Sequence, residues 1–271
     1  MTQPAVRFDQ VGKNYGRQTV LRGIDLDIAA GMSVGLVGIN GAGKTTLIKC
    51  LLDFCHVDHG RIEIFGTRHT DSRARARLAF LPERFMPPYF LTGRDFVTYM
   101  LTLDARAVDE SKVRAMFGAL DLDAAALNQS VRSYSKGMTQ KLGLAACLLS
   151  EPDLLILDEP MSGLDPLARA RVKQLLRQLR DRGRTLFFTS HALSDVEEIC
   201  EHMVVLHQGR LRFRGSPRAL MHDYAPKVSI PLDGKVPTSS GGPDLRSPTL
   251  GYAQDSMEQA FLNCIETRAD D

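Results

Sequence analysis

A glycine-rich segment near the start of the chain constrains the fold more than any other feature. Residues 38–46 read Gly-Ile-Asn-Gly-Ala-Gly-Lys-Thr-Thr. Residues 33–37, just before it, form a short apolar run that suits a buried strand, and residues 47–52 continue as an apolar-rich helix. A strand, a glycine loop and a helix in this order are the setting of a phosphate-binding loop. We therefore expect an α/β fold that binds phosphate groups at this loop.

The residue types in the loop suit this chemistry. Glycines let backbone N–H groups approach phosphate oxygens, and the N-terminus of the following helix adds partial positive charge. Lys44 is expected to reach the β- and γ-phosphates of a nucleotide, and the Thr45 hydroxyl to bind Mg²⁺. Further nucleotide contacts are expected from Gly38, Asn40, Gly41, Ala42, Gly43 and Thr46. The alternative, a glycine-rich turn with a solvated lysine, leaves the flanking strand and helix unexplained.

Composition argues against several other classes of protein. The 271 residues are 44% hydrophobic and 24% charged with a net charge of +2, which is an ordinary globular profile without a nucleic-acid signal. No apolar run reaches the roughly 18 residues that cross a bilayer, and no secretory signal is visible at the N-terminus. The five cysteines include no C-x-x-C pair, so we expect reduced cytosolic thiols packed as small apolar groups.

Alternating apolar residues predict antiparallel-looking strands around the strand that feeds the loop. These strands are expected within residues 6–11, 24–28, 61–65 and 78–81. Among them, Ile24, Leu26 and Ile28 alternate with Asp25 and Asp27, the pattern of a strand with one face in water. Further strands are expected at 154–157, 185–189 and 203–206, with a helix at 166–182.

The middle of the chain is helical in its periodicity, from about residue 92 to residue 150. Thr92 and Asp109 are expected to cap two helices, and a third is expected at 136–149. The pattern therefore predicts an α/β core interrupted by a helical subdomain.

The domain prediction follows from these segments. Residues 1–225 form the predicted main domain, with the helical subdomain inserted at about 92–150. Residues 226–271 form a predicted C-terminal extension with a flexible Pro-, Gly- and Ser-rich connection. Within it we expect a strand at 228–231 and a short helix at 256–266.

A second chemical element lies at residues 154–160, Leu-Leu-Ile-Leu-Asp-Glu-Pro, a buried strand that ends in two adjacent carboxylates. Asp158 is expected to bind Mg²⁺, directly or through water. Glu159 is expected to polarise the water that attacks the γ-phosphate. The alternative is a strand end with two solvated acids.

A third element, residues 134–141, reads Tyr-Ser-Lys-Gly-Met-Thr-Gln-Lys and opens a helix. It resembles the LSGGQ signature of ATP-binding-cassette (ABC) ATPases, with Ser135 and Gly137 retained and Tyr134, Lys136 and Met138 as departures. Alone, the segment is also compatible with an ordinary helix cap at Ser135. Placed between the other two elements, it extends the resemblance over residues 1 to about 225.

This resemblance implies a fold: a P-loop NTPase (RecA-like) core with an antiparallel β-subdomain and an inserted α-helical subdomain. It also implies site residues. Tyr15 takes the place of the aromatic ring that stacks on adenine, although a packing role is open, and His191 takes the place of the switch histidine. Residues 162–165 resemble the D-loop of the dimer interface and are equally suited to cap the helix that begins at Pro166.

Glu83 departs from the family pattern, because most members carry Gln at this position. The resemblance assigns its side-chain oxygen to Mg²⁺ and the attacking water, while the carboxylate adds negative charge there. The following segment, residues 85–91, is rich in aromatic and Met side chains. Docking of a membrane partner and burial in the chain's own core are both open for this segment.

The sequence as a whole resembles the ATP-binding, ATP-hydrolysing subunit of an ABC transporter of the bacterial exporter-type branch. The resemblance implies ATP and Mg²⁺ as cofactors, and a head-to-tail homodimer or heterodimer in which Ser135 and Gly137 complete the partner's site. It also implies a separate transmembrane permease, a peripheral location on the cytoplasmic face of the inner (cell) membrane, and no nucleic acid. The alternative is a soluble ABC ATPase, such as one for iron–sulfur assembly.

Overall fold

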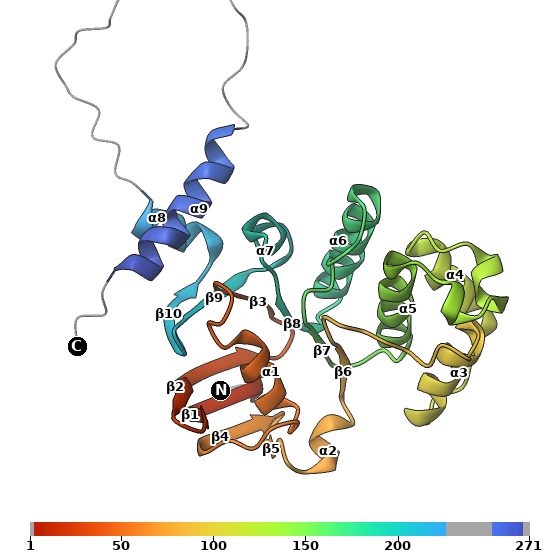
Figure 1. The fold of residues 1–271 in the computed structure, drawn as a ribbon, viewed down its shortest axis with the longest axis horizontal. Helices are drawn as coiled ribbons and strands as arrows, with labels where there is room; N and C mark the ends of the chain where they lie inside the picture. Colours follow the sequence, from red (N-terminus) through yellow and green to blue (C-terminus); the bar gives the residue numbers. More distant parts are fainter. Residues whose placement is uncertain (1–2, 226–250, 268–271) are drawn as a thin grey trace, which may run out of the picture.

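In the computed structural model, residues 3–225 and 251–267 are described, the last helix with side chains from residue 257. An antiparallel sheet forms the N-terminal part, with strand order β2-β1-β4-β5 (Figure 1). Its strands are β1 (Pro4–Tyr15), β2 (Gln18–Ala29), β4 (His59–Ile64) and β5 (Thr67–Arg68). In β2, Ile24, Leu26 and Ile28 are buried and Asp25 and Asp27 are exposed, which confirms the predicted alternation.

A second sheet forms the core, with strand order β10-β9-β3-β8-β7-β6. Its strands are β3 (Ser33–Val37), β6 (Leu78–Leu81), β7 (Leu154–Leu157), β8 (Thr185–Thr189), β9 (His202–His207) and β10 (Arg210–Gly215). Only β10 runs antiparallel to its neighbour among these described strands. The strands in the middle read as continuous apolar runs, because a parallel sheet is covered on both faces.

The predicted position of residues 78–81 was wrong. Strand β6 does not belong to the antiparallel set but pairs in parallel with β7, with Leu78 opposite Leu154. The antiparallel strands do not flank β3 either, since β8 and β9 do. The physical reason lies in the connection: the helical segment between β6 and β7 is long enough for the crossover that parallel neighbours require.

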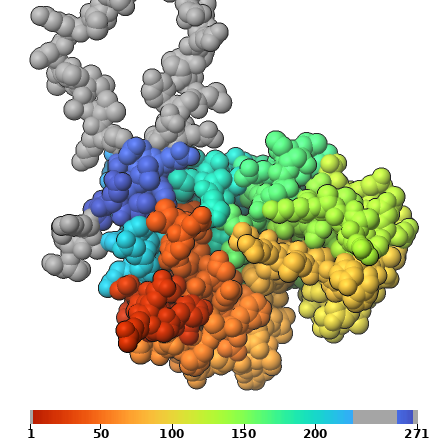
Figure 2. All heavy atoms as spheres, viewed as in Figure 1, coloured from red at the N-terminus to blue at the C-terminus, as the bar shows by residue number. Residues whose placement is uncertain are grey.

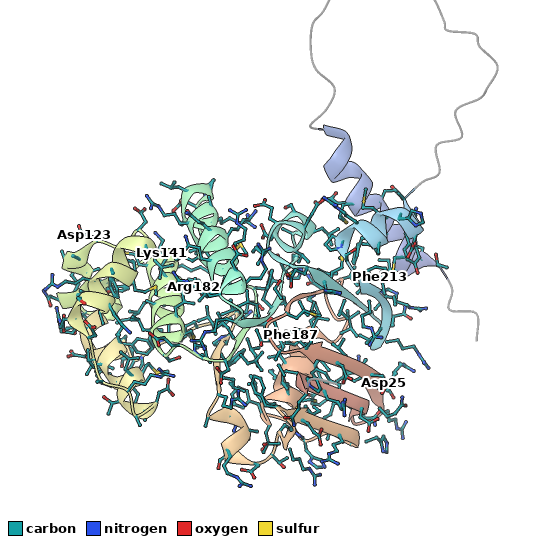
Figure 3. The ribbon with its side chains drawn as sticks, turned by 180° about the vertical axis from the view of Figure 1, so that it is seen from behind. Asp25, Asp123, Lys141, Arg182, Phe187 and Phe213 are labelled. Carbon is teal, nitrogen blue, oxygen red and sulfur yellow. The ribbon has the colours of Figure 1, made fainter. Side chains whose placement is uncertain are left out.

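Helix α1 (Lys44–Leu51) lies between the two sheets. Its Leu47, Ile48 and Leu51 are buried in one apolar cluster with Phe8 of the antiparallel sheet and Phe187 of the core sheet. Figure 3 shows Phe187 near the centre of the molecule. The helix that follows the glycine loop is therefore fixed on both sides, which fixes the loop as well.

The predicted helical insertion is confirmed between β6 and β7. It contains α3 (Gly93–Leu103), α4 (Glu110–Ala119), the 3-10 turns η1 (Ala124–Asn128) and η2 (Val131–Ser133), and α5 (Lys136–Leu149). Thr92 and Asp109 cap α3 and α4 as predicted, Thr92 in a reciprocal capping box with Asp95. Figure 2 shows the insertion, in yellow and green, as a lobe at one end of the molecule.

Helix α2 (Ser72–Arg75) lies beside β4, β5 and β6. The remaining helices cover the outer face of the core sheet and its far edge (Figure 1). They are α6 (Pro166–Asp181), α7 (Leu193–Ile199), α8 (Pro217–Tyr224) and α9 (Gly251–Glu266). Helix α9 begins at Gly251 rather than at the predicted Ser256, and it packs on α8 and beside α7. The strand predicted at 228–231 lies outside the described residues. Within the described ranges, none of the helices has the length and apolar character that a bilayer span needs.

Candidate functional site

The phosphate loop joins β3 to α1 in the conformation that its glycines permit. Gly41 and Gly43 have φ values of 80° and 112°, a region that favours glycine. A Cβ atom at Gly38 would collide with the backbone carbonyl of Leu206 on neighbouring β9. The sequence therefore needs glycine at these positions to bring the loop against the sheet edge.

Lys44 is largely buried at the N-terminus of α1 and reaches back across the loop. Its Nζ donates to the carbonyls of Gly38 at 2.6 Å and Ile39 at 3.3 Å. Burial lowers the pKa of Lys44, while the carboxylates of Glu159, Asp158 and Glu83 oppose that change. The Lys44 amino group therefore lies against two loop carbonyls and near three carboxylates.

Thr189 fixes the two carboxylate residues at the end of β7. Its hydroxyl donates to Oδ1 of Asp158 at 2.7 Å and accepts the backbone N–H of Glu159 at 2.9 Å. Thr189 ends β8, which pairs with β7 so that Leu157 lies opposite Phe188. The sequence interpretation placed this threonine on a strand but did not connect it to the site, because the connection depends on strand register.

Glu159 and His191, two separately predicted site residues, lie in contact beside these residues. Oε1 of Glu159 lies 3.3 Å from Nε2 of His191, and the backbone N–H of His191 donates to Oε2 at 3.3 Å. Burial raises the pKa of Glu159, and His191 opposes that change. A raised pKa makes the carboxylate a better proton acceptor. Glu159 also has a φ of +51°, a conformation that costs a residue other than glycine about 1 kcal/mol or more.

These segments meet around one pocket of about 330 Å³. It is lined by Tyr15, Gln18, Val20, Asn40, Gly41, Ala42, Gly43, Lys44, Thr45, Thr46, Glu83, Asp158, Glu159 and His191. The structure thus brings together most of the predicted site residues, while Gly38 contributes its carbonyl to Lys44 from behind the loop. Gln18 and Val20 were missed. The signal available for Gln18 was its position opposite Tyr15 across the β1–β2 hairpin.

Tyr15 stands half exposed at the mouth of the pocket, at the end of β1. The neighbouring Cys55 thiol raises the pKa of Tyr15, and Thr46 opposes that change more weakly. Nζ of Lys13 lies 5.3 Å from the centre of the ring. The ring is thus accessible from the pocket.

Ser135 and Gly137 are not among the residues that line this pocket. Ser135 caps α5, where its hydroxyl accepts the N–H of Met138 at 3.2 Å. In the predicted D-loop, Asp165 caps α6 and accepts the N–H of Ala168 at 2.9 Å. The capping alternatives are therefore confirmed for both segments, and their roles toward nucleotide stay predictions.

Residues 85–91 divide between the two alternatives that the sequence left open. Phe85 packs in the core, with its ring 5.6 Å from that of Phe96. Met86, Tyr89 and Phe90 are 86%, 66% and 75% exposed. The segment is therefore anchored by Phe85 and presents three large apolar side chains to the surroundings.

The predicted Mg²⁺ ligands are Thr45, Asp158 and Glu83, and all three line the pocket. They supply one hydroxyl and two carboxylates, which are hard oxygen donors of the kind that Mg²⁺ prefers. Thr189 occupies Oδ1 of Asp158, so the second carboxylate oxygen is the one that can face a cation. The donor set therefore fits Mg²⁺.

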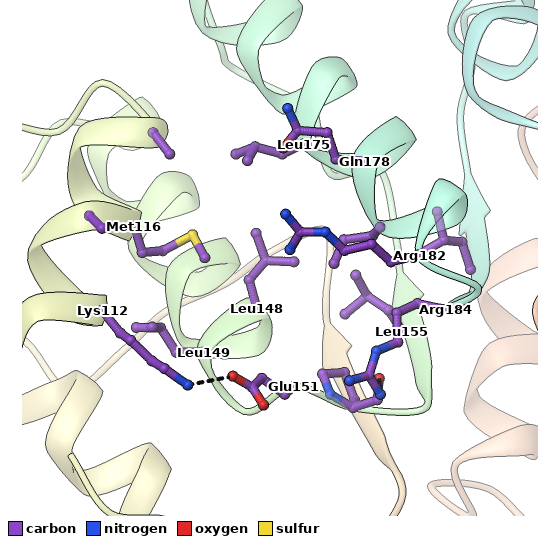
Figure 4. A pocket seen from close by; sticks show the side chains of 15 residues that line it. Lys112, Met116, Leu148, Leu149, Glu151, Leu155, Leu175, Gln178, Arg182 and Arg184 are labelled. Atoms are coloured by element: carbon purple, nitrogen blue, oxygen red, sulfur yellow. Dashed lines mark hydrogen bonds and ion pairs between the residues drawn. The ribbon is translucent and has the colours of Figure 1, made fainter. Parts of the chain in front are cut away.

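Two other pockets differ from this site in their lining. One of about 340 Å³ lies on the other side of Asn40 and His191 and is closed by Glu258, Phe261 and Leu262 of α9. The C-terminal helix therefore reaches the edge of the phosphate loop, which the sequence did not predict. A larger pocket of about 560 Å³ lies between α4, α5 and α6 (Figure 4) and contains none of the predicted site residues.

Comparison with known proteins supports the interpretation of the sequence motifs and of the pocket. The profile of the family described as ABC transporter matches residues 21–162. An ABC transporter ATP-binding protein of Synechocystis sp. is 39% identical over 199 residues, covering 72% of this chain and 56% of that protein. The chain thus spans little more than half of that relative. The Nod factor export ATP-binding protein I of Paraburkholderia xenovorans is 36% identical over 275 residues, covering 99% of this chain and 88% of that protein.

Solved structures agree. An ATP-binding subunit of an ABC transporter superposes with a TM-score of 0.74 at 28% identity, covering 81% of this chain and 93% of the other. The chain therefore belongs to the ABC transporter family and contains its ATP-binding ATPase domain.

Proposed function

We propose that this chain binds ATP with Mg²⁺, hydrolyses it, and thereby powers export through a separate membrane permease. The observation that carries the proposal is the position of Glu159. Its carboxylate lies against His191 at 3.3 Å and lines the same pocket as Lys44 and the phosphate loop. A proton acceptor of raised pKa beside a phosphate-binding loop is what attack of water on a terminal phosphate requires.

The roles of the other residues follow from their contacts. Lys44 and the loop N–H groups bind the phosphates, and Tyr15 offers its accessible ring to adenine. Thr45, Asp158 and Glu83 would hold Mg²⁺, which when bound neutralises charge on the phosphate oxygens. Thr189 positions Asp158 and Glu159 relative to each other through its hydroxyl.

We further propose that two copies of the cassette, from this chain or a related one, pair head to tail. Ser135 and Gly137 lie at the start of α5, on the inserted lobe, and do not line their own chain's pocket. In the proposed dimer they approach the γ-phosphate held by the partner copy. The helix N-terminus there supplies partial positive charge for that contact.

The proposed permease contact is the exposed part of residues 85–91. Met86, Tyr89 and Phe90 are exposed apolar side chains three to seven residues beyond Glu83, which lines the nucleotide pocket. Such residues are enriched at protein interfaces. The relative from Paraburkholderia xenovorans is named for export, which favours an exporter over the iron–sulfur assembly alternative. The chain would then sit on the cytoplasmic face of the inner membrane as a peripheral subunit.

The proposed division of the chain keeps residues 1–225 as the ATPase domain, with residues 226–271 as an extension. All the residues that line the nucleotide pocket lie within 15–191, which supports that division. Helix α9 nevertheless packs on the domain through buried Met257, Ala260 and Cys264. The extension therefore contributes to packing at the edge of the domain.

The decisive experiment compares Glu159→Gln with Glu151→Gln. Glu151 is a surface carboxylate paired with Lys112 at 2.9 Å and distant from the pocket, so it serves as the matched control. Phosphate release by Glu159→Gln should fall about 10²-fold or more, as expected for loss of a general base, while ATP binding persists. Light scattering with ATP should show this variant accumulating as a dimer. Phosphate release at the parental rate would refute the assignment of the base.

The permease proposal has its own test. The protein that co-purifies with this chain from detergent-solubilised membranes should contain bilayer-spanning helices. Recovery of only soluble partners would favour the alternative of a soluble ABC ATPase.

A further inference from the structure

Cys50 and Cys55 place two sulfur atoms in contact beside the nucleotide pocket. Their Sγ atoms lie 3.4 Å apart. Cys50 is buried in the last turn of α1, and Cys55 is partly exposed in the loop that follows. The other cysteines, Cys147, Cys200 and Cys264, are buried on other elements.

The backbone at the end of α1 holds this contact. Asp53 adopts a φ of 61° and turns the chain back over the helix. The N–H groups of Phe54 and Cys55 then both donate to the carbonyl of Lys49, at 2.8 and 3.3 Å. A helix that ends through a left-handed residue such as Asp53 has a defined backbone conformation. This conformation holds the Cys50 and Cys55 side chains together in the reduced protein. A shift of the sulfur atoms by about 1.4 Å reaches the S–S distance of a disulfide.

Tyr15 connects this pair to the nucleotide pocket. The Cys55 thiol lies close enough to the Tyr15 side chain to raise the pKa of Tyr15. Tyr15 in turn lines the pocket. Moving the Cys55 sulfur into a bond with Cys50 therefore changes the contact between Cys55 and a side chain at the mouth of the pocket.

We propose that Cys50 and Cys55 are a site of reversible oxidation by peroxides, and that their disulfide weakens ATP binding. The Cys55 sulfur attacks the O–O bond of hydrogen peroxide, giving a sulfenic acid and water. The Cys50 sulfur then forms the S–S bond and displaces the hydroxyl group, which leaves as water with the Cys50 proton. The two thiols lose two electrons and the peroxide gains them. A dithiol reverses the reaction by exchange.

The order of these two steps follows from accessibility. Cys55 is partly exposed, whereas Cys50 is fully buried and burial raises its pKa to about 12. A buried thiol of that kind is inert toward reagents in solution. Cys50 therefore reacts only across the existing contact, after Cys55 has been oxidised. The effect on ATP rests on the proposed function, because it assumes that adenine meets Tyr15.

The test uses the full chain, first reduced and then treated with hydrogen peroxide. Trypsin cuts after Lys49 and Arg61, so both cysteines fall in one peptide, residues 50–61. A disulfide removes two hydrogen masses from this peptide and blocks alkylation of both cysteines, and dithiothreitol restores them. The dissociation constant of ATP should rise about fivefold on oxidation, the effect of losing about 1 kcal/mol of stacking on the displaced Tyr15 ring.

Two variants separate the disulfide from other oxidation. Cys55→Ser keeps a side chain of similar size beside Tyr15 and cannot cross-link, so its ATP affinity should not respond to peroxide. Cys50→Ala leaves Cys55 open to sulfenic acid and excludes the disulfide, so any remaining loss of affinity would contradict the proposal. If both cysteines can still be alkylated after a hydrogen peroxide treatment that oxidises free glutathione, the proposed oxidation site is wrong. A disulfide that leaves ATP affinity unchanged would overturn the coupling. Failure of the reduced parent to bind ATP would instead overturn the proposed function, and the mapping of the disulfide would still stand.

Discussion

Replacing Thr189 with valine tests how the two carboxylate residues are held. Valine has nearly the same shape as threonine but lacks the hydroxyl. The change leaves a buried oxygen of Asp158 without its 2.7 Å donor and the N–H of Glu159 without its 2.9 Å acceptor. Each buried polar group that loses its partner costs about 1–3 kcal/mol, so the two together should destabilise the fold by about 2–6 kcal/mol.

That loss is a large share of the roughly 5–15 kcal/mol by which a domain is stable. For a domain of this size it corresponds to a fall in melting temperature of about 10 °C. Thermal unfolding followed by circular dichroism measures it, and phosphate release at saturating ATP measures the effect on Glu159. We expect a fall in both, and recovery of both by Thr189→Ser, which restores the hydroxyl.

Thr185→Val is the matched control on the same strand. The Thr185 hydroxyl accepts the N–H of Gly31 at 2.9 Å, at the end of β8 away from the pocket. Loss of this hydroxyl leaves only the N–H of Gly31 without its partner. Thr185→Val should therefore lower the melting temperature less than Thr189→Val does, and it should leave the rate of phosphate release unchanged. The reasoning fails if Thr189→Val melts where Thr185→Val does and hydrolyses ATP at the parental rate.

Three further results are expected. Because burial raises the pKa of Glu159, this carboxylate gains a proton at a higher pH than an ordinary glutamate does. The rate of ATP hydrolysis should therefore fall as the pH drops through that raised pKa. A rate that stays constant down to the ordinary pKa range of a glutamate would contradict this expectation. A chain that lacks residues 226–271 should still bind ATP in a filter assay. Its melting temperature should be lower, because the surface against which Met257 is buried becomes exposed. If the shortened chain folds and does not bind ATP, the extension is part of the site. Replacing Tyr89 and Phe90 together with serine should preserve ATP hydrolysis in solution and abolish recruitment to membranes, which fractionation measures; a folded variant that still reaches the membrane would place the docking surface elsewhere.

Features that depend on neighbouring residues could be predicted from the sequence. The caps at Thr92 and Asp109, the bounds of α5 and the setting of the phosphate loop all rest on contacts within a few residues. The predicted site residues of the loop, the β7 end and His191 come from short sequence motifs. The structure places them around one pocket.

Features that depend on which strands pair could not be predicted in the same way. An apolar run such as residues 78–81 fits a parallel or an antiparallel neighbour, because periodicity does not identify the partner. The role of Thr189 comes from its register against β7, and that of Gln18 from the hairpin with Tyr15. The approach of α9 to the phosphate loop was missed for the same reason, since many residues separate the two in the chain.

The order of strands in the core sheet also determines when the nucleotide site can form during synthesis. Strand β3, which leads into the phosphate loop, pairs with β8 and β9, so Ser33 lies opposite Leu186. At typical rates of translation the ribosome needs roughly 10–30 s to add the residues between β3 and β8. The β1–β2–β4 sheet consists of near neighbours and can pair early, whereas β3 remains without either neighbour until most of the chain has left the ribosome. During that interval an apolar strand edge is open to wrong partners, so we expect the growing chain to need chaperone protection before it can bind ATP.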